Sequence, residues 1–341
     1  MMNTNARTTP PVPERLFAQM GIARRAVLQG LASATLGVPR LAFGQTSGRV
    51  RRVVLYSGTP RWKDVVSGGL RDLGWAIGRD ALVDWRSTAE IANLEMDLRH
   101  ELQQPVDAFI MGGPQAIYTA MKVTDKVPIV GIDLESDPVA RGFVKSLARL
   151  GKNVSGVWMD LPQLAGKQLQ FLREVLPGLR RVGVVWDEEI GGPQWTEVQA
   201  AAHASNIAVH AISLHAPSEA EDVVRRLLAD RSEAMLALTA PTIFRALPRL
   251  AELAIQKRLP SISPFSTYPE SGGLMAYGPD FVAMYRQTSS YVDRIFKGAN
   301  VGDLPVERPS KFVLIVNVKT SKALGLTIPQ SLLLRADQVI E

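Results

Sequence analysis

The sequence predicts an α/β protein built from two doubly wound lobes, each a parallel sheet with helices on both faces. Three observations lead to this fold class. The chain has 341 residues, and single cores stop growing at about 250–300 residues, so two domains are expected. From Arg52 onward, short fully apolar runs alternate with amphipathic stretches, as a parallel sheet buried on both faces requires. The same alternation restarts after about residue 155.

The first half of the chain is expected to alternate strands and helices up to about residue 132. Gly74 and Pro105 are typical residues at which a helix ends, and Pro114 suits the first position of a helix. We expect strands at 53–56, 82–85, 108–111 and 128–132, and helices at 62–73, 89–104 and 114–122.

The second half repeats this order and then continues past it. The run Ala108–Pro114 is echoed by Ala234–Pro241, although any two βα units look partly alike. The left-over helix and strand after the second lobe indicate that the chain crosses back between the lobes, which would form a hinge. We expect helices at 162–175, 193–205, 218–230, 241–257, 281–297 and 320–324 and from Pro329, and strands at 182–186, 209–214, 234–238, 260–263, 274–277 and 312–316.

Residues 1–44 are expected to be an export signal that is cleaved near Gly44. The pair Arg24-Arg25 precedes a mildly apolar stretch, Gly30–Val38, and small residues at Ala42 and Gly44 precede the expected cut. This order is typical of a secretory signal, and the paired arginines resemble a twin-arginine signal. The alternative is a membrane anchor, but about twelve apolar residues are fewer than the roughly twenty that span a bilayer. A periplasmic location follows.

Charge and cysteine content exclude several classes of protein. The chain has 39 Lys+Arg, 33 Asp+Glu and no Cys, so disulfide scaffolds, thiolate metal sites and Cys nucleophiles are excluded. Without the five arginines and one glutamate of residues 1–44, 34 basic and 32 acidic residues remain, a net charge of +2. No basic stripe with interleaved aromatic residues follows, so nucleic acid is not an expected partner.

Candidate ligand-binding residues follow the strands, because ligands of open α/β sheets lie beyond the carboxyl ends of strands and at helix N-termini. Glycines there allow close backbone approach, hydroxyls donate hydrogen bonds, and aromatic rings, among them Trp186 and Tyr268, offer apolar walls. We expect Asp137 or Asp187 to hold an ammonium group. Many such residues are also ordinary turn and cap residues. The candidates are Ser57, Gly58, Trp62, Gly113, Gln115, Asp137, Asp187, Thr239, Ala240, Phe265 and Tyr277.

The sequence offers no motif for catalysis, a cofactor or a metal. It lacks the Gly-x-Ser-x-Gly elbow, the phosphate-binding loop and the dinucleotide fingerprint after the first strand. The segment 133–144 faintly resembles a calcium loop, but Pro138 and Val144 occupy positions that need Gly and Glu. We therefore expect no catalytic residue, no cofactor and no metal site.

Several longer motifs resemble one known family. They are Gly69–Gly74, Ser136–Val139, Gly151–Val157, Leu172–Pro177, Glu270–Gly278, Asp303–Glu307 and Lys322–Pro329. On these motifs the chain resembles the substrate-binding proteins of ABC importers, of the tryptophan/tyrosine type. One departure is the run Trp186–Glu189, where many relatives have an Asn-Pro-Asn-type loop; it adds negative charge at the rim of the expected cleft.

The resemblance implies two Rossmann-like lobes with the type I periplasmic-binding-protein architecture, joined by a three-segment hinge. The implied lobes are 52–156 plus 280–310 and 158–278 plus 312–334, with crossings near 156–158, 278–280 and 310–312. It also implies an exported solute-binding protein, not an enzyme, with two partners: a small-molecule ligand such as an amino acid, and an ABC permease in the inner membrane. The alternative is an exported α/β enzyme that acts on a small metabolite; a binding protein would return its ligand intact.

Overall fold

The computed structural model describes residues 49–88, 93–146, 153–158 and 164–341. The expected export signal, residues 1–44, lies outside the described residues, as does the expected start of the helix at 89–104. Within the described ranges, no helix combines the length and the apolar character needed to cross a membrane.

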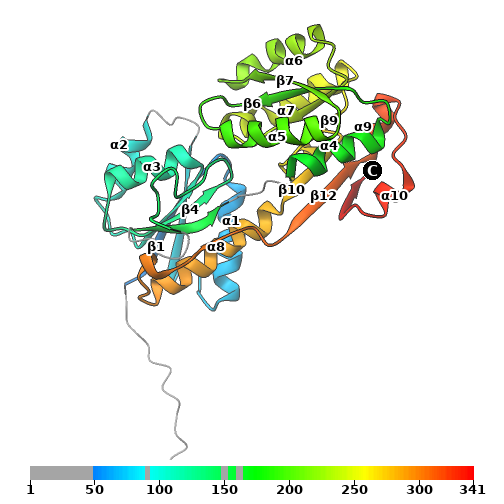
Figure 1. The fold of residues 1–341 in the computed structure, drawn as a ribbon. Helices are drawn as coiled ribbons and strands as arrows, with labels where there is room; N and C mark the ends of the chain where they lie inside the picture. The colour runs from blue at the N-terminus through cyan, green and yellow to red at the C-terminus, as the bar shows by residue number, and fades with distance from the viewer. Residues whose placement is uncertain (1–48, 89–92, 147–152, 159–163) are drawn as a thin grey trace, which may run out of the picture. The chain divides into compact units, whose positions relative to one another are not determined.

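The first sheet, sheet A, is parallel throughout (Figure 1). Its strands lie in the order β11-β5-β4-β3-β1-β2, so the chain winds outward in both directions from its middle strands. The strands are β1 (Arg51–Ser57), β2 (Ala81–Ser87), β3 (Ala108–Gly112), β4 (Ile129–Asp133), β5 (Val154–Trp158) and β11 (Val306–Glu307).

Helices cover both faces of sheet A, because successive side chains of a strand point to opposite faces. Val53 and Leu55 belong to the core on one face, and Val54 and Tyr56 belong to the core on the other. The first face carries α1 (Arg61–Asp72) and α8 (Phe281–Phe296), and the second carries α2 (Leu94–Glu101) and α3 (Pro114–Val123).

The second sheet, sheet B, has the order β13-β12-β10-β9-β8-β6-β7. All its neighbouring strands are parallel except β10 and β12, which are antiparallel. Its strands are β6 (Arg181–Trp186), β7 (Ala208–Ser213), β8 (Ala234–Ala237), β9 (Ser261–Ser263), β10 (Met275–Pro279), β12 (Phe312–Asn317) and β13 (Gln338–Ile340).

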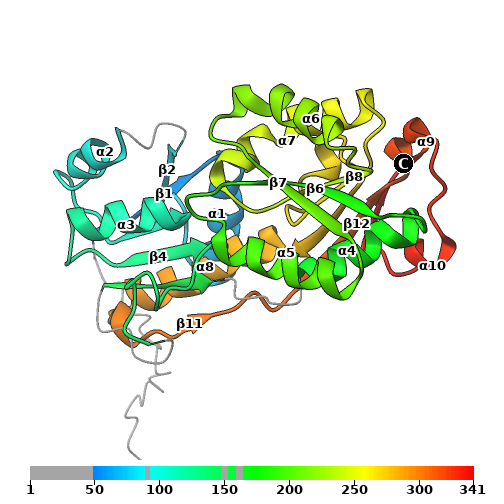
Figure 2. The ribbon, with the colours of Figure 1, turned by 45° about the horizontal axis from the view of Figure 1, so that its top comes forward.

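Sheet B is also covered on both faces (Figure 2). Val184 packs toward α4 and α5, whereas Val185 packs toward α6 and α7. The helices of this half are α4 (Leu164–Val175), α5 (Gly192–Ala204), α6 (Ala220–Ala229), α7 (Pro241–Gln256), α9 (Val318–Leu324) and α10 (Gln330–Leu333). Short 3-10 helices are η2 (Pro217–Glu219), η3 (Pro269–Ser271) and η4 (Val301–Asp303). The expected fold class, two doubly wound α/β sheets, is therefore confirmed.

The chain passes between the two sheets more than once. After β10 of sheet B it enters α8, which packs on sheet A, and after β11 of sheet A it enters β12 of sheet B. The earlier passage follows β5, which pairs with β4 as far as Trp158. The exact division of the chain into lobes stays a prediction.

Three strands differ from the sequence expectation. β5 and β11 were not expected, and β13 lies where the last helix was expected to continue, since that helix, α10, ends at Leu333. β11 and β13 have two and three residues, too short to show an apolar periodicity. They form because their main-chain groups can hydrogen-bond to a neighbouring strand, β5 for β11 and β12 for β13. This pairing depends on the tertiary fold and not on the local sequence.

Candidate functional site

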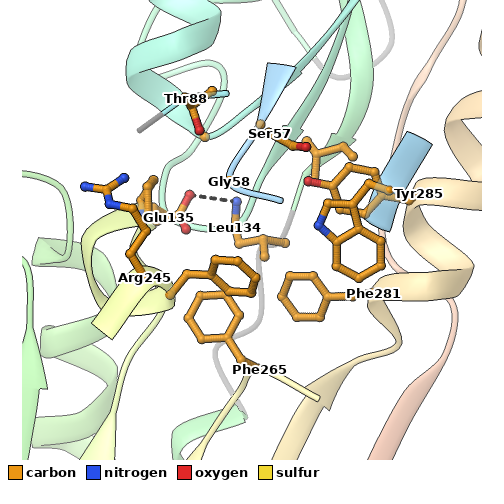
Figure 3. A pocket seen from close by; sticks show the side chains of 15 residues that line it. Ser57, Gly58, Thr88, Leu134, Glu135, Arg245, Phe265, Phe281 and Tyr285 are labelled. Carbon is orange, nitrogen blue, oxygen red and sulfur yellow. Dashed lines mark hydrogen bonds between the residues drawn. The ribbon is translucent and has the colours of Figure 1, made fainter. Parts of the chain in front are cut away.

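A pocket that opens to solvent is lined mainly by residues that follow strands of both sheets. From the first half of the chain come the loops after β1, β2, β3 and β4. From the second half come the start of α7, the segment after β9 and the first turns of α8. Figure 3 shows this arrangement; the lining residues are Ser57, Gly58, Trp62, Thr88, Gly112, Gly113, Ile132, Leu134, Glu135, Pro241, Phe244, Arg245, Phe265, Phe281 and Tyr285.

One wall of the pocket is a continuous row of aromatic rings. The rings of Trp62 and Tyr285 stack with centroids 4.3 Å apart and an interplanar angle of 3°. Trp62 also stacks on Phe281 at 6.3 Å, and Phe281 lies 5.3 Å from Phe265. Phe244 completes the row at 5.1 Å from Phe265. Such a wall suits a flat apolar group, because aromatic pairs prefer offset-stacked or edge-to-face contacts.

The packing of α1 against α8 fixes the first part of this row. Trp62 lies in the first turn of α1 and is 2% exposed, and Tyr285 lies one turn into α8 and is 6% exposed. Burial raises the pKa of the Tyr285 hydroxyl, so this hydroxyl stays neutral. The wall is therefore preformed and uncharged.

Glycine lets the loops of the two sheets approach each other. Gly113 has φ +89°, a left-handed conformation that disfavours any side chain, and it precedes the Pro114 that begins α3. A Cβ atom at Gly113 would lie 3.1 Å from Pro241 Cγ at the start of α7. The pocket therefore depends on backbone geometry at this position.

A basic and an acidic side chain, Arg245 and Glu135, line the other side of the pocket, across from Phe281 and Tyr285 (Figure 3). The Nη1 atom of Arg245 is buried and has no hydrogen-bond partner among the described residues. Burial also lowers the pKa of the Arg245 guanidinium. A buried donor without a partner is costly, so Arg245 is poised to receive an acceptor, best an anionic one.

Glu135 is 6% exposed, and its Oε2 accepts a hydrogen bond from the main-chain N–H of Leu134 at 3.1 Å. Burial and the neighbouring carboxyl of Asp133 raise the pKa of Glu135 well above its ordinary value. A cationic group placed beside Glu135 would relieve this unfavourable charge.

A second pocket is also lined by the segment Leu134–Ser136. Leu134 and Glu135 line both pockets, and the second one is completed mainly by α4 and α5, including Gln168 and Gln194. The hydroxyl of Thr239 donates to Gln194 Oε1 at 2.7 Å and also lies 3.3 Å from the carbonyl oxygen of Leu134. The segment after β4 therefore divides the space between the loops of the two sheets.

Five of the eleven candidate residues line the first pocket: Ser57, Gly58, Trp62, Gly113 and Phe265. The Ser57 hydroxyl already donates to the carbonyl of Thr59 at 2.9 Å and accepts from the indole N–H of Trp85 at 3.0 Å. It therefore supports the loop as well as lining the pocket.

The two aspartates expected to hold an ammonium group lie outside the lining of this pocket. Asp137 is exposed and accepts hydrogen bonds from the main-chain N–H groups of Val139 and Ala140, at 2.7 and 3.2 Å. Asp187 accepts hydrogen bonds from the hydroxyl of Thr242 at 3.3 Å and from the N–H of Glu189. Both carboxylates cap their own loops, and the acid that lines the pocket is Glu135.

The remaining candidates lie outside the lining of the pocket. Gln115 is exposed on α3, and Ala240 is fully buried before α7. Thr239 is fully buried and bonded to Gln194, and the ring of Tyr277 lies between Phe171 and Phe312, at 5.0 and 6.3 Å. Two other aromatic residues expected to form apolar walls also lie elsewhere. Tyr268 is buried and its hydroxyl donates to that of Ser261, and the ring of Trp186 packs on Trp195.

Sequence reasoning missed most of the pocket's chemistry. Phe244 and Arg245 lie inside α7, and Phe281 and Tyr285 lie on α8, whereas most residues expected from the sequence lie in loops that follow strands. Glu135 lies in the same turn after β4 as Asp137, the acid that the sequence favours. The apolar or charged character of these pocket residues can be read from the sequence. Their position at the pocket cannot, because it depends on the tertiary fold. Among the described residues, no group of three His, Asp or Glu side chains is placed to hold a metal ion.

Comparisons with known proteins agree on one family and one fold. The sequence model described as ABC transporter substrate binding protein matches residues 50–340. The tyrosine-binding protein of Clostridioides difficile is 25% identical over 266 residues, which cover 75% of this chain and 74% of that protein.

Two solved structures show the same fold, each with a TM-score of 0.77. A conserved domain protein from Vibrio cholerae is 23% identical, and an ABC domain from Streptococcus pneumoniae in complex with L-Trp is 21% identical. Each match covers 86% of this chain and the whole of the other.

Proposed function

The chain belongs to the ABC transporter substrate-binding protein family, and from this premise we propose that it is the exported solute-binding component of an ABC importer. In this role it captures a small molecule of the amino-acid class and delivers it to a permease in the inner membrane. The aromatic wall opposite Arg245 and Glu135 is the observation that carries this proposal.

The pocket suits a ligand with three parts. A ring would lie against the aromatic row, a carboxylate would accept from Arg245, and an ammonium group would lie beside Glu135. An aromatic amino acid carries all three groups on one small framework. The tyrosine-binding relative and the L-Trp-bound ABC domain support this class of ligand.

Capture would work by closure of two lobes rather than by chemistry. We take the lobes to be 52–156 plus 280–310 and 158–278 plus 312–334. A ligand that touches residues of both lobes favours the closed form, because only there does it make all of its contacts. The ligand would leave chemically unchanged, because the protein only binds it and releases it.

Binding is tested by native mass spectrometry of the protein isolated from its own periplasm, followed by calorimetric titration. We expect a retained small molecule, and binding of L-tyrosine, L-tryptophan or L-phenylalanine but not of glucose or L-lysine. Mass spectrometry of the ligand after incubation should show it intact. Conversion into a product would favour the exported-enzyme alternative.

Export is tested separately, in the producing cell. Replacing Arg24 and Arg25 together by Lys should retain the chain in the cytoplasm, because a twin-arginine signal needs both guanidinium groups. The matched control is Arg40→Lys, which lies near the expected cut and should leave export unchanged. Periplasmic accumulation of the paired variant would show that this signal type is wrong.

A further inference from the structure

The turn after β4 brings two buried carboxyl groups together. Asp133, fully buried, accepts hydrogen bonds at Oδ1 from the N–H groups of Glu135 and Ser136, at 2.9 and 3.1 Å. Its Oδ2 accepts from the hydroxyl of Ser136. Glu135 accepts at Oε2 from the N–H of Leu134 at 3.1 Å, and its carboxyl group also hydrogen-bonds with that of Asp133. The hydrogen bonds favour ionisation of Asp133 more than that of Glu135.

No cation compensates these two acids among the described residues. Neither Asp133 nor Glu135 forms an ion pair with a described Lys, Arg or His. Arg245 lines the same pocket, yet its Nη1 is unpartnered. Two adjacent buried carboxylates cannot both stay ionised at low cost, so one of them favours the protonated form.

The other titratable groups near Glu135 either raise its pKa further or carry no charge. Asp187, which directly follows β6, adds negative charge. The Tyr285 hydroxyl on α8 stays neutral, because burial raises its pKa. Burial first, and then the charge of Asp133, raise the pKa of Glu135. Glu135 is therefore the member of the pair that retains a proton.

We propose that Glu135 carries a proton while the pocket is empty and releases it to solvent when the ligand's ammonium group takes its place. One proton then leaves for each ligand captured, and no other bond changes. This inference rests on the proposed function for its ligand class. It makes Glu135 the residue that distinguishes an amino acid from the same molecule without its amine.

The sign of the pH dependence follows from the direction of proton flow. Because capture releases a proton, the affinity rises with pH while Glu135 of the empty protein is protonated, by up to about tenfold per pH unit. A ligand without the ammonium group has no cation to replace the proton. Its affinity should lack this rise.

Calorimetry in two buffers of different ionisation enthalpy, phosphate and Tris, measures the proton count directly. The probes are L-tryptophan and indole-3-propionate, which lacks the amine. We expect about one proton released with tryptophan and none with indole-3-propionate. Glu135→Gln should abolish the release, whereas the matched control Glu197→Gln should retain it.

A second measurement does not depend on any ligand. Carbon-13 NMR of the glutamate carboxyl groups in the empty protein follows Glu135, assigned by its loss in Glu135→Gln. Titration of Glu135 near its ordinary value of about 4.3 would overturn the inference, as would proton release that persists in Glu135→Gln. Absence of binding by every aromatic amino acid would instead contradict the proposed ligand class.

Discussion

Asp280 and Lys311 hold together two of the chain segments that run between the sheets. The main-chain N–H of Asp280 donates to the carbonyl oxygen of Lys311 at 2.9 Å. Lys311 Nζ donates in turn to Asp280 Oδ2, also at 2.9 Å. Asp280 also caps α8, since its Oδ1 accepts from the N–H of Ala283 at 3.1 Å. The side chain thus fixes both the start of α8 and the spacing of two crossings.

Asp280→Asn is expected to lower the free energy of unfolding at pH 7, because Asn can still cap the helix but loses the ion pair. Burial works to raise the pKa of Asp280, but the hydrogen bonds from Lys311 and Ala283 outweigh it and lower that pKa. The stabilisation is therefore present above the unfolded-state pKa and disappears as the pH falls through the folded-state value. Urea unfolding at pH 7 and pH 2 should give a gap between wild type and variant only at pH 7. An equal gap at both would contradict this role.

Trp62→Phe should weaken binding of an aromatic ligand by about three- to tenfold, on the scale of about 1 kcal/mol for an aromatic contact. The smaller ring removes part of the stacked wall that Trp62 forms with Tyr285. Calorimetry gives the affinity, and the same substitution at Trp195, outside this pocket, is the control. Equal affinities for both variants would exclude Trp62 from the binding surface.

Arg245→Gln should weaken binding of a carboxylate-bearing ligand by about a hundredfold, because it removes one partner of a desolvated charge pair. The free energy of unfolding should not fall, since the lost guanidinium has a buried Nη1 without a partner. Arg249→Gln is the matched control on α7, where Arg249 forms exposed ion pairs with Glu221 and Glu252. Tryptamine, which lacks the carboxylate, should bind the Arg245 variant and the wild type alike; a large difference would argue against this role.

Ligand binding should make the protein more compact. Arg61 and Glu270 already form an ion pair at 3.0 Å between the start of α1 and η3. Both side chains are about half exposed, so this pair contributes little. Closure should therefore depend on the ligand, and Glu270→Gln should close as wild type does. Small-angle scattering should give a smaller radius of gyration at saturation. An unchanged curve with a confirmed ligand would contradict closure.

Local pattern predicted the fold well and the pocket only in part. The apolar runs at 108–111 and 182–186 identified β3 and β6, because strands buried on both faces leave a local signal. β13 has no such signal and forms only against β12. In the pocket, Trp62 comes soon after β1, so the sequence places it among the expected lining residues. Arg245 lies inside an amphipathic helix, where a surface residue and a pocket residue look the same in sequence.

A crystal structure of the protein with a saturating aromatic amino acid would locate the binding site itself. We expect ligand density in the pocket, with the ring against Trp62 and Phe281, the carboxylate on Arg245 and the amine beside Glu135. Density elsewhere on the molecule, or a ligand that leaves Arg245 without a partner, would contradict it.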